Sequence, residues 1–263
     1  MPPARKRLRS YDHDKVVAAV RAQFGHVRAA VDTLTPEQFA LPTRLGDWTV
    51  RELSAHIAMV ASLVVGYLER PEPETVDLAL LDWPFATVTA QAKVDEDTRA
   101  FAAGPEIGDL FARTGRDLDA VLPGAPPARI VPMRFGGMRL GDFLVTRTVE
   151  MVVHTDDLAD ATGLEIPYDR QALAACTRLL ADAIAVKAPG GSTEVRIPPY
   201  AVVQCVEGPR HTRGTPPNVV ETDPLTWIRL ATGRTTWADE LAAATVRASG
   251  ERADLGPLLP ILG

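Results

Sequence analysis

The segment TRTVEMVVHTDDLADATG, residues 146–163, combines the apolar periodicity of a buried helix with several charged side chains. Glu150 and His154 are four residues apart, which places them one above the other on the same helix face. Charged groups inside an apolar helix cost free energy unless they are paired or bind a metal ion. The spacing therefore indicates a carboxylate and an imidazole that share one partner, with Asp157 one turn further along.

A second segment of the same character offers a third donor. His56 lies in the middle of ELSAHIAMV, residues 52–60, an apolar stretch that follows a Thr49–Glu52 capping box. Two helices of a bundle that supply His, Glu and His form an open metal site, and three protein ligands with a free fourth position are typical of catalytic zinc. Taken singly, each motif also fits an exposed face or an internally hydrogen-bonded side chain.

The rest of the chain divides into a helical part and a mixed part. Apolar periodicity predicts further helices over residues 11–35, 47–70, 85–103, 105–122 and 169–188. Gly136-Gly137 lies between two short alternating runs and predicts a hairpin, after which Asp142 should begin the helix that ends near Gly163. Beyond Gly191, short β-rich runs alternate with short helices. We expect a helical bundle over residues 1–190 and a small α+β domain over residues 191–263.

Composition limits the function classes. The chain has 263 residues, a net charge of −6 and a pI of about 5.4, which argues against nucleic acid or an anionic membrane as a partner. The basic start MPPARKRLRS reads as a solvated tail, because it lacks the apolar run of a signal peptide. The longest apolar stretch, residues 57–68, is shorter than a membrane span needs. We therefore expect a soluble, cytoplasmic protein whose cysteines, Cys176 and Cys205, are free and buried.

Two segments together resemble a known family. DWTVRELSAHIAMV (47–60) and EMVVHTDDLADATG (150–163) are similar to two motifs of the DinB-like superfamily and, more narrowly, of mycothiol-dependent maleylpyruvate isomerases. Residues 223–255, which begin DPLTWIRLATGR, resemble the sterol-carrier-like domain often fused to them. The resemblance implies a DinB-like four-helix bundle followed by a small sterol-carrier-like α+β domain. It also implies a divalent metal ion, usually zinc, held by His56, Glu150 and His154, with Asp157 as a hydrogen-bonding partner of a ligand.

The resemblance also implies a chemistry. Mycothiol, as thiol cofactor or co-substrate, would lose its proton at the metal and add to an activated C=C bond; rotation and loss of the thiol would complete an isomerisation. The enolate formed on the substrate needs positive charge nearby, for which Arg234 and then Arg229 are the candidates. Both arginines also fit ordinary cations at a helix end.

The sequence indicates the class of reaction more narrowly than it indicates the substrate. The Pro-rich segment of residues 70–88 borders the expected cleft and can reshape specificity. We therefore predict metal-dependent addition or transfer of a thiol to a small electrophile, by a thiol transferase or an isomerase, with maleylpyruvate as one candidate. Three alternatives stay open: a non-catalytic carrier of small molecules or lipids, a zinc-dependent hydrolase, and a protein that acts through protein contacts. A monomer and a homodimer fit equally well.

Overall fold

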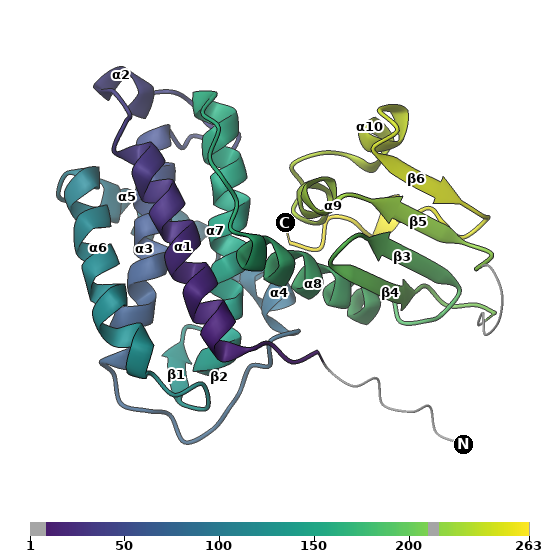
Figure 1. The fold of residues 1–263 in the computed structure, drawn as a ribbon, viewed down its shortest axis with the longest axis horizontal. Helices are drawn as coiled ribbons and strands as arrows, with labels where there is room; N and C mark the ends of the chain where they lie inside the picture. The colour runs from purple at the N-terminus through teal and green to yellow at the C-terminus, as the bar shows by residue number, and fades with distance from the viewer. Residues whose placement is uncertain (1–8, 210–215, 263) are drawn as a thin grey trace.

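The computed structural model describes residues 9–209 and 216–262 (Figure 1). Most of the expected solvated tail lies outside these residues. The helices are α1 (His13–Val31), α2 (Pro36–Phe39), α3 (Val50–Leu68), α4 (Trp83–Ala86), α5 (Gln91–Ala102), α6 (Ile107–Val121), α7 (Leu140–Thr162), α8 (Arg170–Lys187), α9 (Pro224–Ala231) and α10 (Trp237–Ala242). The strands are β1 (Ile130–Met133), β2 (Gly136–Arg139), β3 (Thr193–Ile197), β4 (Ala201–Cys205), β5 (Val219–Thr222) and β6 (Val246–Ser249). The expected fold class, a helical bundle followed by a small α+β domain, is confirmed.

Four long helices form the bundle. α1 packs against α6 and α7, and α3 packs against the same two helices from the other side. α3 is long and apolar enough to cross a membrane, although the stretch expected from sequence was too short. Its contacts with α5, α6 and α7, and the burial of residues such as His56 along it, are those of a core helix.

α7 carries Glu150 and His154. It starts at Leu140 rather than at Asp142, which lies inside the first turn. It ends at Thr162, close to the expected position, and is capped by Gly163, whose φ of 71° lies in the left-handed region that glycine adopts without strain.

The β1–β2 hairpin packs against α3 and α7, and the linker between α3 and α4, residues 69–82, crosses it. β1 and β2 pair as expected, but Met133 faces Gly136, so Arg134 and Phe135 make the turn and the glycine pair begins β2. A side chain at Gly137 would place its Cβ 2.2 Å from the carbonyl oxygen of Thr75 in the linker. Glycine is therefore required here because the linker crosses the strand, and not because of the turn. The helix expected over residues 85–103 is divided into α4, a 3₁₀ turn and α5.

The carboxyl-terminal domain is a four-stranded sheet in the order β4-β3-β5-β6. β3 and β5 are parallel, and the outer pairs are antiparallel. α8 packs against α1 and α7 on one side and against β4 and α9 on the other (Figure 1). α8 thus packs against both the bundle and the carboxyl-terminal sheet. The domain boundary near residue 190 stays a prediction.

Candidate metal centre

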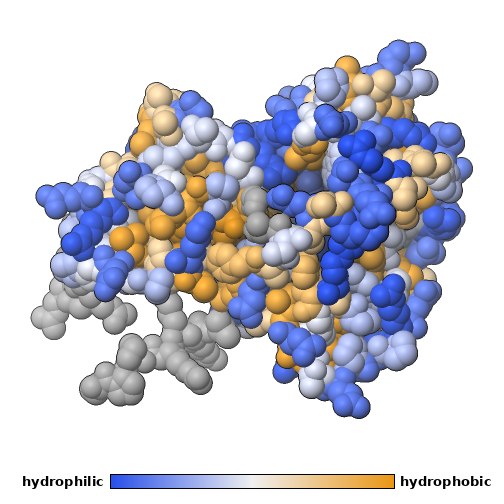
Figure 2. Space-filling view, turned by 180° about the vertical axis from the view of Figure 1, so that it is seen from behind, coloured by the Kyte–Doolittle hydropathy of each residue, from blue (hydrophilic) through white to orange (hydrophobic). Residues whose placement is uncertain are grey.

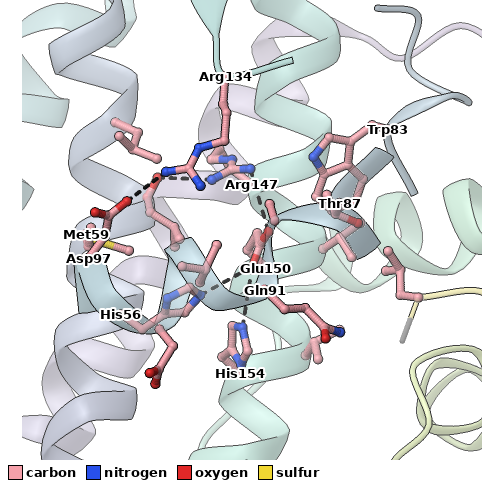
Figure 3. Close-up of a pocket in the computed structure, with 18 of the residues that line it drawn as sticks. His56, Met59, Trp83, Thr87, Gln91, Asp97, Arg134, Arg147, Glu150 and His154 are labelled. Atoms are coloured by element: carbon pink, nitrogen blue, oxygen red, sulfur yellow. Dashed lines mark hydrogen bonds and ion pairs between the residues drawn. The ribbon is translucent and has the colours of Figure 1, made fainter. Parts of the chain in front are cut away.

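Three side chains from two helices meet at one point. His56 comes from the middle of α3, and Glu150 and His154 come from successive turns of α7 (Figure 3). Each offers one ligand atom, and these atoms lie within 4.8 Å of one another. Oε2 of Glu150 is 3.4 Å from Nε2 of His154 and 3.7 Å from Nε2 of His56.

These separations fit a shared metal ion better than direct hydrogen bonds. A hydrogen bond between nitrogen and oxygen spans about 2.7–3.2 Å. Two ligands at zinc bond lengths and a tetrahedral angle are about 3.4 Å apart. The spacing of the three donor atoms therefore fits a divalent metal ion such as zinc, which the sequence motifs imply.

Partners on the far side of each ring fix its orientation. Nδ1 of His56 lies 3.1 Å from Oγ1 of Thr98 on α5. Nδ1 of His154 lies 2.8 Å from Oδ2 of Asp157, a side chain with no exposed surface. When each Nδ1 donates its proton to the neighbouring oxygen, both Nε2 atoms present a lone pair to the shared point.

The electrostatics of the three groups also favour a cation. Burial alone would raise the pKa of Glu150, but the two imidazoles and Arg147 hold its pKa well below its usual range. Burial lowers the pKa of His56 and keeps that ring neutral. Burial would also lower the pKa of His154, but Asp157 and Glu150 raise its pKa above the ordinary value, so a proton and a metal ion compete for its Nε2.

A cavity of about 620 Å³ opens beside the three donors. In the space-filling view, the surface between the bundle and the carboxyl-terminal domain is notched (Figure 2). Most of the cavity wall is apolar or aromatic, and its residues come mainly from α3, α5, α7 and the hairpin, with Trp83 from α4. The apolar side chains include Met59, Leu63, Tyr67, Trp83, Phe135, Phe143 and Val149. The linker segment thus contributes Trp83 and Thr87 to the wall, near the position expected from sequence.

The two arginines expected to face the substrate are placed differently. Arg234 lines the cavity, but its guanidinium binds Asp157 at 2.9 Å and the carbonyl of Thr232 at 2.6 Å. Arg229 is not among the cavity-lining residues and forms a bidentate contact with Asp156. The expected roles therefore stay hypotheses, and the geometry of Arg229 offers them no support.

Arg147 is a cavity residue that the sequence analysis did not single out. Its guanidinium is almost completely buried, stacks on Phe143 at 4.6 Å and lies 3.7 Å from Oε1 of Glu150. Arg147 precedes Glu150 by three residues, so the two share a helix face. The argument applied to a carboxylate in an apolar helix applies equally to this guanidinium, and could have identified it.

Both cysteines are buried and neither forms a disulfide, as predicted. Neither Cys176 nor Cys205 belongs to the described cavity lining. Burial raises the pKa of the Cys176 thiol, which keeps it protonated. A thiol that reacts at this site would therefore come from outside the chain.

The fold and site define a helical-bundle protein with a candidate metal centre and a small α+β domain. Residues 20–159 match the family described as mycothiol maleylpyruvate isomerase N-terminal domain, and residues 169–261 match the family described as bacterial SCP ortholog. The first match covers more than half of the chain, so this protein belongs to the mycothiol maleylpyruvate isomerase family. The second match begins at α8 and thus groups that helix with the sheet.

Solved structures agree in fold. Two crystal structures of mycothiol-dependent maleylpyruvate isomerase, one of them a histidine-to-alanine mutant, each align with 93% of this chain over 95% of their own length. The mutant has a TM-score of 0.61 at 14% identity, and the other has 0.59 at 16%. Identities this low show a shared fold alone. The comparison with curated proteins gave no match.

Proposed function

We propose that this protein is a cytoplasmic enzyme that activates mycothiol for addition or transfer to a small electrophile. The activation takes place at a divalent metal ion, for which zinc is the first candidate. Cis–trans isomerisation of maleylpyruvate is one candidate reaction. The observation that carries the proposal is the convergence of His56, Glu150 and His154 at the wall of a largely apolar cavity. Family membership supports mycothiol as the thiol, because the description of the family names it.

The residues of this chain have distinct tasks in such a reaction. His56, Glu150 and His154 would hold the ion, and Thr98 and Asp157 orient the two rings. When bound, the metal would supply Lewis acidity that lowers the pKa of a thiol. The apolar wall excludes water from the reacting groups and so strengthens the electrostatic interactions among them.

Arg147 supplies positive charge next to the reacting groups. Its nitrogens bond to Oγ1 of Thr146 at 3.1–3.2 Å and to the carbonyl of Val60 at 3.4 Å. The nearest oxygen of Glu150 is 3.7 Å away, beyond hydrogen-bond distance. A buried guanidinium has five N–H donors, and these contacts do not satisfy all of them. The remaining donors can bind an anionic group, such as a carboxylate or an enolate oxygen.

Replacing Arg147 by methionine should therefore lower kcat/KM for a carboxylate-bearing electrophile about ten- to a hundredfold, as expected when one charged hydrogen bond is lost. The neutral methyl ester of the same electrophile should change little. The effect is measured as the ratio of kcat/KM for the acid to kcat/KM for the ester, each divided by the uncatalysed rate of the same electrophile. Arg134→Met is the matched control, because Arg134 also lines the cavity but is paired with Asp97 and partly exposed. Equal losses for acid and ester would contradict this role.

One assay separates the proposed enzyme from its alternatives. Protein purified without chelator is analysed for metal and then incubated with maleylpyruvate and other electrophiles, with and without mycothiol. We expect one divalent ion per chain and turnover that requires mycothiol. Equal turnover without the thiol would favour a hydrolase, which an open zinc site can also support. A wild-type protein without bound metal would leave the carrier as the better description and end the catalytic proposal.

A further inference from the structure

A cluster of charges joins the metal centre to the carboxyl-terminal domain. Asp156 and Asp157 are consecutive on α7, and both are nearly inaccessible, with 3% and 0% of their surface exposed. Buried carboxylates are expensive unless they are paired and hydrogen-bonded. Three arginines from separate segments supply the pairing: Arg44 from the loop after α2, Arg229 from α9, and Arg234 from the loop after α9.

Of these three arginines, Arg44 is the one that contacts both carboxylates. Its Nε donates to Oδ1 of Asp157 at 2.6 Å, and its Nη2 donates to Oδ2 of Asp156 at 2.5 Å. Arg229 binds Asp156, and Arg234 binds Asp157. A planar guanidinium that spans two neighbouring carboxylates fixes their relative orientation, which a single point charge cannot do.

The loop that carries Arg44 is itself held in place. The backbone N–H and the hydroxyl of Thr43 both donate to the carbonyl of Trp48, at 3.0 Å and 2.8 Å. The closed loop leads directly into α3, the helix of His56. Arg44 is therefore anchored to the same helix that supplies the first proposed metal ligand.

Asp157 is the link to the metal centre. Its Oδ2 receives the Nδ1 proton of His154 at 2.8 Å and an N–H of Arg234 at 2.9 Å. Its Oδ1 receives Arg44 at 2.6 Å and Arg234 at 3.1 Å. Both oxygens are thus held by arginines, and the carboxylate cannot turn away from the imidazole. A ligand ring held in this way keeps its Nε2 aimed at the metal.

We propose that Arg44 is a positioning residue which, through Asp157, sets the affinity of the His56/Glu150/His154 site for its metal ion. The inference rests on the proposed function, because it presupposes that these three residues bind a metal. Arg44 does not contact the donor atoms, so its effect acts through the orientation of His154. Loss of such an outer partner weakens metal binding by about ten- to a hundredfold in metal sites generally.

The test measures zinc affinity of the full-length chain by competition with a chromogenic chelator. We expect Arg44→Ala to bind Zn²⁺ about ten- to a hundredfold more weakly than the wild type. Arg44→Lys should recover part of this loss, because lysine restores the charge but not the two-carboxylate fork. Arg229→Ala is the charge-matched control: it removes a guanidinium from Asp156 and leaves the contacts of Asp157 in place.

The outcomes separate this inference from the proposed function. A purely structural role for Arg44 would lower the melting temperatures of both alanine variants and leave the zinc affinity of the folded proteins unchanged. Zinc affinity of Arg44→Ala within threefold of the wild type, or an equal loss in Arg229→Ala, would overturn the inference alone. If Arg44→Ala does not fold, the comparison of Arg44→Lys with Arg229→Lys decides instead. A wild type that binds no zinc would overturn the metal site itself.

Discussion

Alanine at position 154 should leave the protein without its metal ion and reduce thiol-dependent turnover by about a thousandfold or more. The imidazole of His154 supplies one of the three donor atoms, and its Nε2 lies 3.4 Å from Glu150. Two remaining protein ligands hold a divalent ion too weakly to survive purification. The Lewis acidity of a bound metal contributes several kcal/mol to a polar transition state, and about 4 kcal/mol corresponds to a thousandfold in rate.

Metal analysis and a mycothiol-dependent assay of the same preparation test this expectation. His26→Ala is the matched control, because His26 lies on α1 and is not among the residues that line the cavity. The control should retain its metal and its turnover. A His154→Ala protein that keeps stoichiometric metal and wild-type turnover would show that the ion and the chemistry lie elsewhere.

Removal of the Asp157 carboxylate should have the largest effect on stability. Asp157→Ala would remove the buried carboxylate that both Arg44 and Arg234 bind. Removing one partner of a buried ion pair costs about 3–5 kcal/mol, and here Arg234 would lose its carboxylate partner while Arg44 would keep Asp156. That cost is a large fraction of the total stability of an ordinary domain, about 5–15 kcal/mol.

The measurement is thermal or denaturant unfolding of metal-free protein, which keeps any loss of bound metal from contributing. Asp160→Ala is the control on the same helix, because the Asp160 side chain is 57% exposed and lies 4.0 Å from Arg44. An exposed ion pair of this kind contributes less than about 1 kcal/mol. A loss for Asp157→Ala as small as that of the control would mean that the two arginines find other partners or water.

Residue spacing was enough to place Glu150 and His154 on one helix face and to single out His56, but it did not predict the surroundings of these side chains. Any two helical residues four positions apart share a face, as Glu150 and His154 do. His56 could be singled out because it is a polar residue in an apolar helix. Arg44 gave no such signal, because an arginine in a loop before a helix reads as solvated. Its partners become visible only when α2, α3 and α7 are assembled.

The roles expected of Arg229 and Arg234 show the same limit. The family resemblance implied that they face the substrate, but side-chain direction depends on how the two domains dock. The hairpin is a further case. Gly136-Gly137 suggested a turn, whereas Gly137 is required by the close approach of the linker at Thr75. Fold class and helix order depend on local periodicity, and these were predictable.

The shared position of α8 limits how ligands can reach the metal centre. Because α8 packs against the bundle on one side and the sheet on the other, swinging the two domains apart would expose apolar surface, at about 25 cal/mol per Å². The segment from Trp83 to Ala102 is also packed against the core, because Trp83 and Pro84 of α4 and Thr98 and Ala102 of α5 are buried. Opening the cavity either at the domain interface or at α4 and α5 would therefore expose side chains that are now buried.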